Sequence, residues 1–85
     1  MTERYLLRGE YKELKDKERV LLSEFKTVQQ NIFESLYRIT DLTNVYEPAE
    51  DVAEVEQLLK KLGELKAEYT RLKIRLEYLR KRLNL

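Results

Sequence analysis

The sequence of 85 residues contains no cysteine and no histidine. Without cysteine there is no disulfide framework and no thiolate to act as nucleophile or metal ligand. Without histidine the chain lacks the commonest metal ligand and the one side chain that ordinarily titrates near neutral pH. These two absences exclude most familiar catalytic and metal-binding designs. We therefore expect no enzymatic activity, no cofactor and no metal site.

Long apolar runs are also missing, since no stretch approaches the roughly 18 consecutive apolar residues of a transmembrane helix. Residues 1–9 acquire charge too quickly for a signal peptide. The charged fraction of 39% beside an apolar fraction of 42% is unlike that of a disordered polyampholyte. We expect a cytoplasmic protein that makes no contact with membranes.

The only proline, Pro48, lies between two long amphipathic segments. In the second segment every a and d position of an unbroken heptad is apolar or aromatic. These positions are Val55, Leu58, Leu62, Leu65, Tyr69, Leu72, Leu76, Leu79 and Leu83. Because this repeat averages 3.5 residues per turn, it keeps one stripe of a helix facing a partner helix. The pattern predicts a coiled-coil helix over about 51–84.

A second heptad runs along the first segment and predicts a helix over about 3–43. Its d positions are Leu7, Leu14, Leu21, Val28, Ser35 and Leu42, and its a positions are Tyr11, Glu18, Phe25, Ile32 and Ile39. A turn is expected over about 44–50. Asp51 and Glu54 have the spacing of a capping box for the second helix, and Pro48 offers an earlier start because proline fits the first turn.

Two arms of similar length joined by a short loop predict one all-α domain over 1–85, an antiparallel two-helix coiled-coil hairpin. Pairing residues whose numbers add up to about 90 matches the two seams end to end, for example Phe25 with Leu65 and Leu14 with Leu76. A slip of one heptad, with sums near 97, matches almost as well. The sequence leaves both alignments open.

The first helix carries apolar residues outside its seam, and the second adds two more. In an antiparallel pair the e positions of both helices flank the same side of the seam, so Leu22, Leu36, Val52 and Leu59 should form one exposed ledge. Covering this ledge and Phe33 is worth several kcal/mol at about 25 cal/mol per Å². Since so small a domain rarely stands alone, we expect a homodimeric four-helix bundle. The expected interface residues are Val20, Leu22, Phe33, Leu36, Val52 and Leu59.

Charge is unevenly distributed although the net charge is only +1. Residues 34–57 hold seven acids and one base, whereas residues 58–85 hold nine bases and three acids. A hairpin therefore has an acidic loop end and a basic terminal end. An antiparallel dimer places each acidic tip beside the basic part of the other copy, so we expect that orientation.

Five cations continue the ledge toward the termini at e positions. They are Arg8, Lys15, Lys66, Lys73 and Arg80, and they form a candidate surface for an anionic partner. Lysine and arginine at e positions usually cover the core with their methylenes, and a nucleic-acid-binding domain usually has a clear basic excess. We therefore expect protein partners, with nucleic-acid binding as an alternative.

The sequence contains one cluster of acidic residues and one isolated acid at a seam position. Glu50, Asp51, Glu54 and Glu56 form the densest carboxylate cluster, but they lack calcium-loop spacing, so helix capping and solubility explain them better. Glu18 is the one charge aimed into a seam, where it either reaches a neighbouring cation or specifies alignment.

The architecture is similar to that of Rop-type RNA-binding bundles and of hairpins in secretion and phage accessory proteins, and this similarity transfers no residues. The leading hypothesis is a structural or adaptor protein that acts through coiled-coil self-association and protein contacts. The alternatives are a small nucleic-acid-binding regulator and a chaperone or escort for a partner helix.

Overall fold

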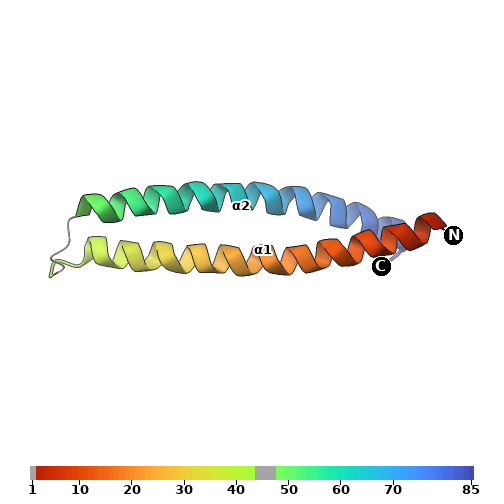
Figure 1. Cartoon of the computed structure of the whole chain (residues 1–85), viewed down its shortest axis with the longest axis horizontal. Helices are drawn as coiled ribbons and strands as arrows, with labels where there is room; N and C mark the ends of the chain where they lie inside the picture. Colours follow the sequence, from red (N-terminus) through yellow and green to blue (C-terminus); the bar gives the residue numbers. More distant parts are fainter. Residues whose placement is uncertain (1, 44–47) are drawn as a thin grey trace.

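The chain forms two long antiparallel helices. A computed structural model describes residues 2–43 and 48–85, and it contains helix α1 over Thr2–Thr40 and helix α2 over Pro48–Leu83. The two helices lie side by side in a rod of 64 × 15 × 15 Å, with both termini at one end (Figure 1). The predicted all-α two-helix hairpin is confirmed, and its pairing with a second copy stays a prediction.

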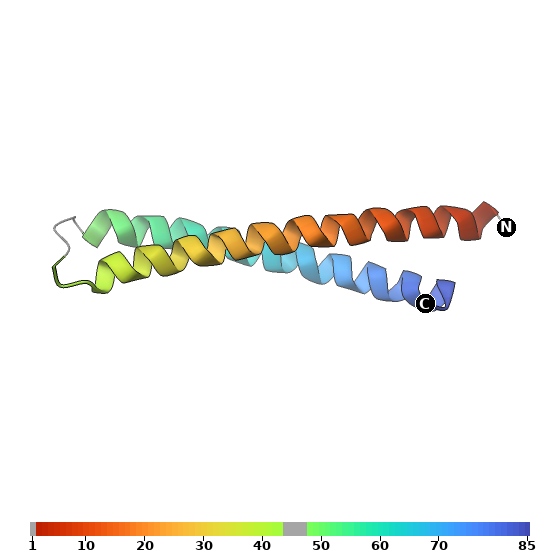
Figure 2. The same cartoon turned by 90° about the horizontal axis from the view of Figure 1, so that it is seen from below.

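The core lies along the predicted seam. The buried apolar residues of the main cluster all occupy a or d positions, and they are Leu21, Val28 and Ile32 of α1 and Leu65, Leu72 and Leu76 of α2. Leu79 and Leu83 are buried near the end of α2. The helices cross at a shallow angle, which keeps the seam closed over many turns (Figure 2). The a and d residues are thus used within the hairpin.

Contacts between the helices decide between the two alignments. Ion pairs join Glu3 to Arg82, Glu10 to Arg75, and Lys17 to Glu68. Near the loop Arg38 pairs with Asp51. The residue numbers of these ion pairs add up to 85 or 89. These sums are close to the value of about 90 that the first alignment gives for facing seam residues. The alignment slipped by one heptad, with sums near 97, is therefore wrong.

Helix α1 ends at Thr40, three residues before the predicted end. The carboxylate of Asp41 accepts hydrogen bonds from the backbone N–H of Thr43 at 3.0 Å and from the Thr43 hydroxyl at 2.7 Å. Such an Asx turn competes with helix continuation. Leu42, predicted as a seam residue, is consequently fully exposed at 100%.

Helix α2 begins at Pro48, the earlier of the two starts that the sequence offered, rather than at residue 51. Part of the predicted turn, residues 44–47, lies outside the described residues, and residues 48–50 are helical. Asp51 is therefore a d residue inside the first turns and not a cap. At the other end, Asn84 has a φ of 58°, and the N–H groups of Asn84 and Leu85 donate to the carbonyls of Lys81 and Arg80. This Schellman motif ends the helix at Leu83.

Candidate interaction surface

One side of the seam, the g flank, is closed by ion pairs between the helices. Arg75 donates two hydrogen bonds to Glu10 at 2.7 and 2.8 Å, and this holds the pKa of the Glu10 carboxyl below its usual value. All of the paired residues on this flank occupy g positions. They are Glu3, Glu10, Lys17 and Arg38 of α1 with Arg82, Arg75, Glu68 and Glu54 of α2.

The opposite side of the seam, the e flank, has a different composition in each half. Its residues are Arg8, Lys15, Leu22, Gln29 and Leu36 of α1, and Val52, Leu59, Lys66, Lys73 and Arg80 of α2. The four ledge residues remain open, with exposed fractions of 50% for Leu22, 41% for Leu36, 43% for Val52 and 51% for Leu59. The hairpin therefore leaves the predicted ledge uncovered on its loop half.

A groove of about 360 Å³ lies where the ledge meets the basic half of the e flank. Leu22 and Phe25 form its wall on α1, and Leu65, Lys66 and Tyr69 form its wall on α2. Because e residues from both helices line this groove, Leu22 and Lys66 lie at the same level of the hairpin. An apolar side chain of a partner would contact apolar side chains of both helices in this groove.

Two further residues of the predicted interface differ in position from the ledge. Phe33 is 60% exposed at a b position, next to the e row of α1. Val20 is also exposed, but it occupies a c position adjoining the g row of Lys17 and Glu24. A single face can therefore include Phe33 with the ledge, whereas Val20 lies on the other side of α1.

Glu18 lies between two cations of the basic half. It is 7% exposed, and its two carboxylate oxygens lie 3.0 Å from Lys15 Nζ and 3.3 Å from Lys73 Nζ. The hydrogen bond from Lys15 is the main reason that the pKa of Glu18 is below its usual value, and the same bond raises the pKa of Lys15. Of the two roles considered for Glu18, the structure shows pairing with neighbouring cations.

The remaining predicted cations have different surroundings. Arg80 donates to both oxygens of Glu77 at 2.7 and 3.2 Å and to the carbonyl of Leu85, and the Glu77 carboxylate raises the pKa of Arg80. Lys66 lines the groove, and Arg8 is exposed near the termini. Three of the five predicted cations thus have carboxylate partners within the hairpin. Their charge is partly compensated before any anionic partner arrives.

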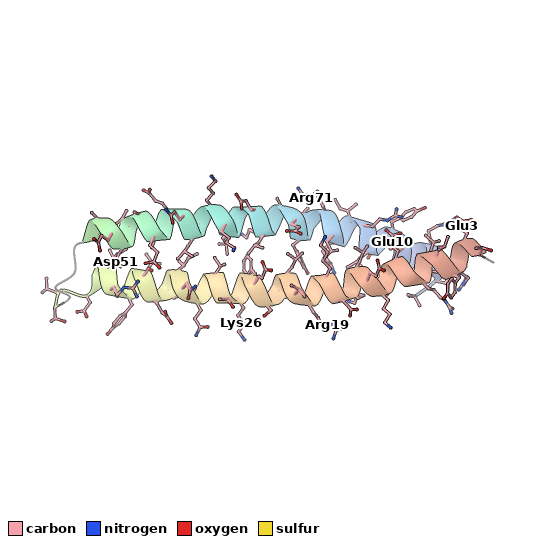
Figure 3. All side chains as sticks on the ribbon, viewed as in Figure 1. Glu3, Glu10, Arg19, Lys26, Asp51 and Arg71 are labelled. Atoms are coloured by element: carbon pink, nitrogen blue, oxygen red, sulfur yellow. The ribbon has the colours of Figure 1, made fainter. Side chains whose placement is uncertain are left out.

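A polar cluster near the loop was missed by the sequence interpretation. Arg38 donates to Asp51 Oδ1 at 3.1 Å, to Ser35 Oγ at 3.0 Å and to Glu54 Oε2 at 3.3 Å. Asp51 points from α2 toward α1, whereas Arg19 and Lys26 point away from α2 (Figure 3). Asp51 Oδ2 is buried without a hydrogen-bond partner among the described residues. Extending the heptad of α2 back by seven residues would have placed Asp51 at a d position.

The outer face of α2 has a shallow depression of about 770 Å³. It includes the exposed apolar side chains of Ile74 and Tyr78, and Arg75 lies 4.9 Å from the centre of the Tyr78 ring. Because the lining comes from one helix, this depression lacks the two-sided wall of the e-flank groove. It is the weaker candidate for a binding site.

Within residues 2–43 and 48–85, no group of acidic side chains has the arrangement of a metal site. Neither described helix is both long and apolar enough to cross a bilayer. Comparisons with known protein families, curated proteins and solved structures found no match. The fold and the e flank are thus the basis for any functional argument.

Proposed function

We propose that this chain is a non-enzymatic structural or adaptor protein that acts by self-association through its e flank. Two hairpins pack ledge against ledge and form a four-helix bundle, which then presents its ends to other proteins. The observation that carries this proposal is the contrast between the flanks. Ion pairs close the g flank, whereas four large apolar side chains stay about half exposed on the e flank.

Energetics favour covering the ledge. The four ledge side chains and Phe33 sum to a patch whose burial in both copies contributes several kcal/mol at about 25 cal/mol per Å². A domain of this size has a marginal stability of the same order. Self-association is the simplest cover, because each copy supplies the same apolar patch that the other needs.

The charges favour an antiparallel dimer over a parallel one. In a parallel pair the basic ends of both hairpins meet, and the e-flank cations face each other. In an antiparallel pair each acidic loop end lies beside basic residues of the other copy. Compensation of Lys15, Lys73 and Arg80 within the hairpin supports protein contacts more than binding along a nucleic-acid backbone.

Sedimentation equilibrium tests the proposal with matched variants. Leu36→Glu and Leu59→Glu each place a charge on the ledge, and Ile74→Glu places the same charge on the outer face of α2. We expect the unmodified chain and the Ile74 variant to form dimers, and both ledge variants to sediment as single chains with helical circular dichroism retained.

Two outcomes would contradict the proposal. The first is an unmodified chain that stays monomeric at all concentrations, which would favour a different helix as occupant of the ledge. The second is a dimer that both ledge variants leave intact, which would move the interface to another face.

A further inference from the structure

We infer that the two copies pair through their e flanks in a staggered antiparallel arrangement, with the two-fold axis passing Gln29 of α1 and Leu59 of α2. The inference rests on the proposed self-association and specifies its geometry. The hairpins are displaced from full overlap by two heptads, roughly 21 Å at about 1.5 Å per residue. Each basic end then extends beyond the other copy.

The apolar ledge selects this displacement. In an antiparallel pair of hairpins α1 faces α1 and α2 faces α2, so facing positions have residue numbers with a constant sum. With the axis at Gln29 and Leu59, Leu22 faces Leu36 of the second copy, and the two Leu59 side chains face each other. Val52 lies opposite the aliphatic stem of Lys66, which can cover apolar surface while its ammonium stays in water.

The groove on the e flank fits the same arrangement. It lies at the level of Leu22, Phe25 and Lys66. The stagger brings Leu36 and Phe33 of the second copy to this level, and these are two of the exposed apolar side chains of the loop half. Each copy thus supplies a groove and the apolar side chains that enter it, so the contact occurs twice about the axis.

Full overlap of the two rods gives a poorer match. Its axis would pass Leu22 and Lys66, and Leu36 would then face Arg8 of the second copy. Val52 would face Arg80, and Leu59 would face Lys73. Three of the four ledge residues would meet charged side chains, and most of the apolar surface would be covered by groups that must keep their heads in water.

The staggered arrangement places opposite charges near each other and buries enough area for a specific interface. The acidic tip of each copy, with Asp41 and Glu50, comes within two residues of the levels of Lys15 and Lys66 in the other copy, about 3 Å along the rod. The overlapping faces are roughly 40 Å long and about 15 Å wide, so the pair buries roughly 1,200 Å², within the range of specific interfaces. The uncovered ends with Arg8 and Arg80 project in opposite directions.

Cysteine cross-linking tests the axis directly, because the natural chain contains no cysteine. A disulfide requires Cα atoms within about 7 Å of each other. Gln29→Cys places the thiol at the proposed axis, and the neighbouring Gln30→Cys places it on the outer face of α1 as a control for random collision. Lys66→Cys places it at the axis of the fully overlapped dimer. All three positions are exposed.

Under mild oxidation we expect the Gln29 variant to form a covalent dimer at least tenfold faster than the Gln30 and Lys66 variants. Faster cross-linking of the Lys66 variant would overturn the stagger in favour of full overlap. Equal rates for all three variants, with a dimer still present in sedimentation, would overturn the stagger and leave self-association standing. Single-chain mass for the reduced variants and the unmodified protein would overturn both proposals.

Discussion

Glu18 shows how a single buried charge can be accommodated in an otherwise apolar seam. Its carboxylate holds Lys15 and Lys73, two cations at the same level on opposite helices that would otherwise repel each other. Because both lysines are about half exposed, water screens their charges, and their ion pairs with Glu18 contribute only modestly to stability. The main effect is to let two like charges lie on the e flank.

Replacing Glu18 by glutamine should destabilise the hairpin at pH 7 by about 1 kcal/mol, because the lysines lose their charged acceptor. The pKa of Glu18 is lowered below 4.5 in the folded chain, so its contribution is present above that pH and is lost as pH falls through the lowered value. Urea unfolding followed by circular dichroism at pH 7 and pH 3 measures both effects.

The glutamine variant should also lose less stability than the natural chain between pH 7 and pH 3. It keeps part of the acid sensitivity, since the pKa values of Glu10 and Glu77 are lowered by their arginine partners. Equal stability at pH 7 together with an unchanged acid response would show that the contact of Glu18 with the two lysines contributes nothing.

Asp51 and Arg38 allow an asymmetric test of the buried polar cluster. Asp51→Leu places leucine at a d position and removes a carboxylate whose Oδ2 lacks a partner among the described residues, so we expect a hairpin at least as stable as the natural one. Arg38→Leu leaves the buried carboxylate without its cation and should cost about 2 kcal/mol. Thermal and urea unfolding of the two variants gives the comparison.

The reverse order of stability would show that Asp51 acts chiefly through the N-terminus of α2, where acidic residues are favourable. That result would contradict the assignment of Asp51 to the seam.

At the scale of the helices, the two flanks differ: ion pairs join the helices along the g flank, and we propose association along the e flank. Two ion pairs on the g flank, Glu10 with Arg75 and Glu3 with Arg82, join residues that are 65 and 79 positions apart in sequence, and they are compatible with one alignment of the helices. Exposed ion pairs add little stability, but opposite charges at facing g positions disfavour the slipped alignment. The e flank is left for contacts outside the hairpin.

Reversing one charge of the best-formed g-flank pair should weaken the hairpin, and reversing both should restore it. Arg75→Glu places two carboxylates opposite each other, and we expect its melting temperature to fall by about 5 °C at low salt. The double variant Glu10→Arg/Arg75→Glu should recover most of that loss. The difference should shrink as salt approaches 1 M, because exposed charges are then screened.

Melting curves at a fixed protein concentration measure this coupling. Arg71→Glu, which makes the same change of net charge as Arg75→Glu at an exposed position outside the g row, is the control for net charge alone. A double variant no more stable than the single one would contradict a direct contact between positions 10 and 75.

The heptads made the two helices, the seam and the hairpin predictable, because a and d periodicity reports directly which residues a helix buries. Leu42 and Asp51 show where this reasoning fails. The Asx turn at Asp41 ends α1 before the pattern ends, and Asp51 looks like a cap until the helix is known to begin at Pro48. Local turn chemistry decides both ends, and periodicity does not report it.

The ledge was predictable from the e positions once an antiparallel hairpin was assumed, and the groove beside it was not. Its shape depends on how Phe25 and Tyr69 pack at the edge of the seam, which the heptad pattern does not determine. Val20 lies on a different side of α1 from the ledge, because c and e positions point in different directions from a helix, and its part in an interface stays a prediction.

At the scale of the whole molecule, the hairpin is a rod whose two halves differ in charge and surface. Both the excess of acids and the apolar ledge belong to the loop half, and the bases concentrate toward the termini. The staggered dimer that we propose would cover the ledges in the middle and leave two basic ends far apart. Such a shape can bridge two partners, as an adaptor requires.

Small-angle X-ray scattering of the unmodified chain tests ledge-mediated association most directly, because it gives mass and length together. We expect a mass twice the 10.3 kDa of one chain. We expect a longest dimension of about 85 Å, which is the 64 Å of one hairpin plus the displacement of two heptads. A particle with the mass of one chain and a longest dimension near 64 Å at all concentrations would contradict ledge-mediated association.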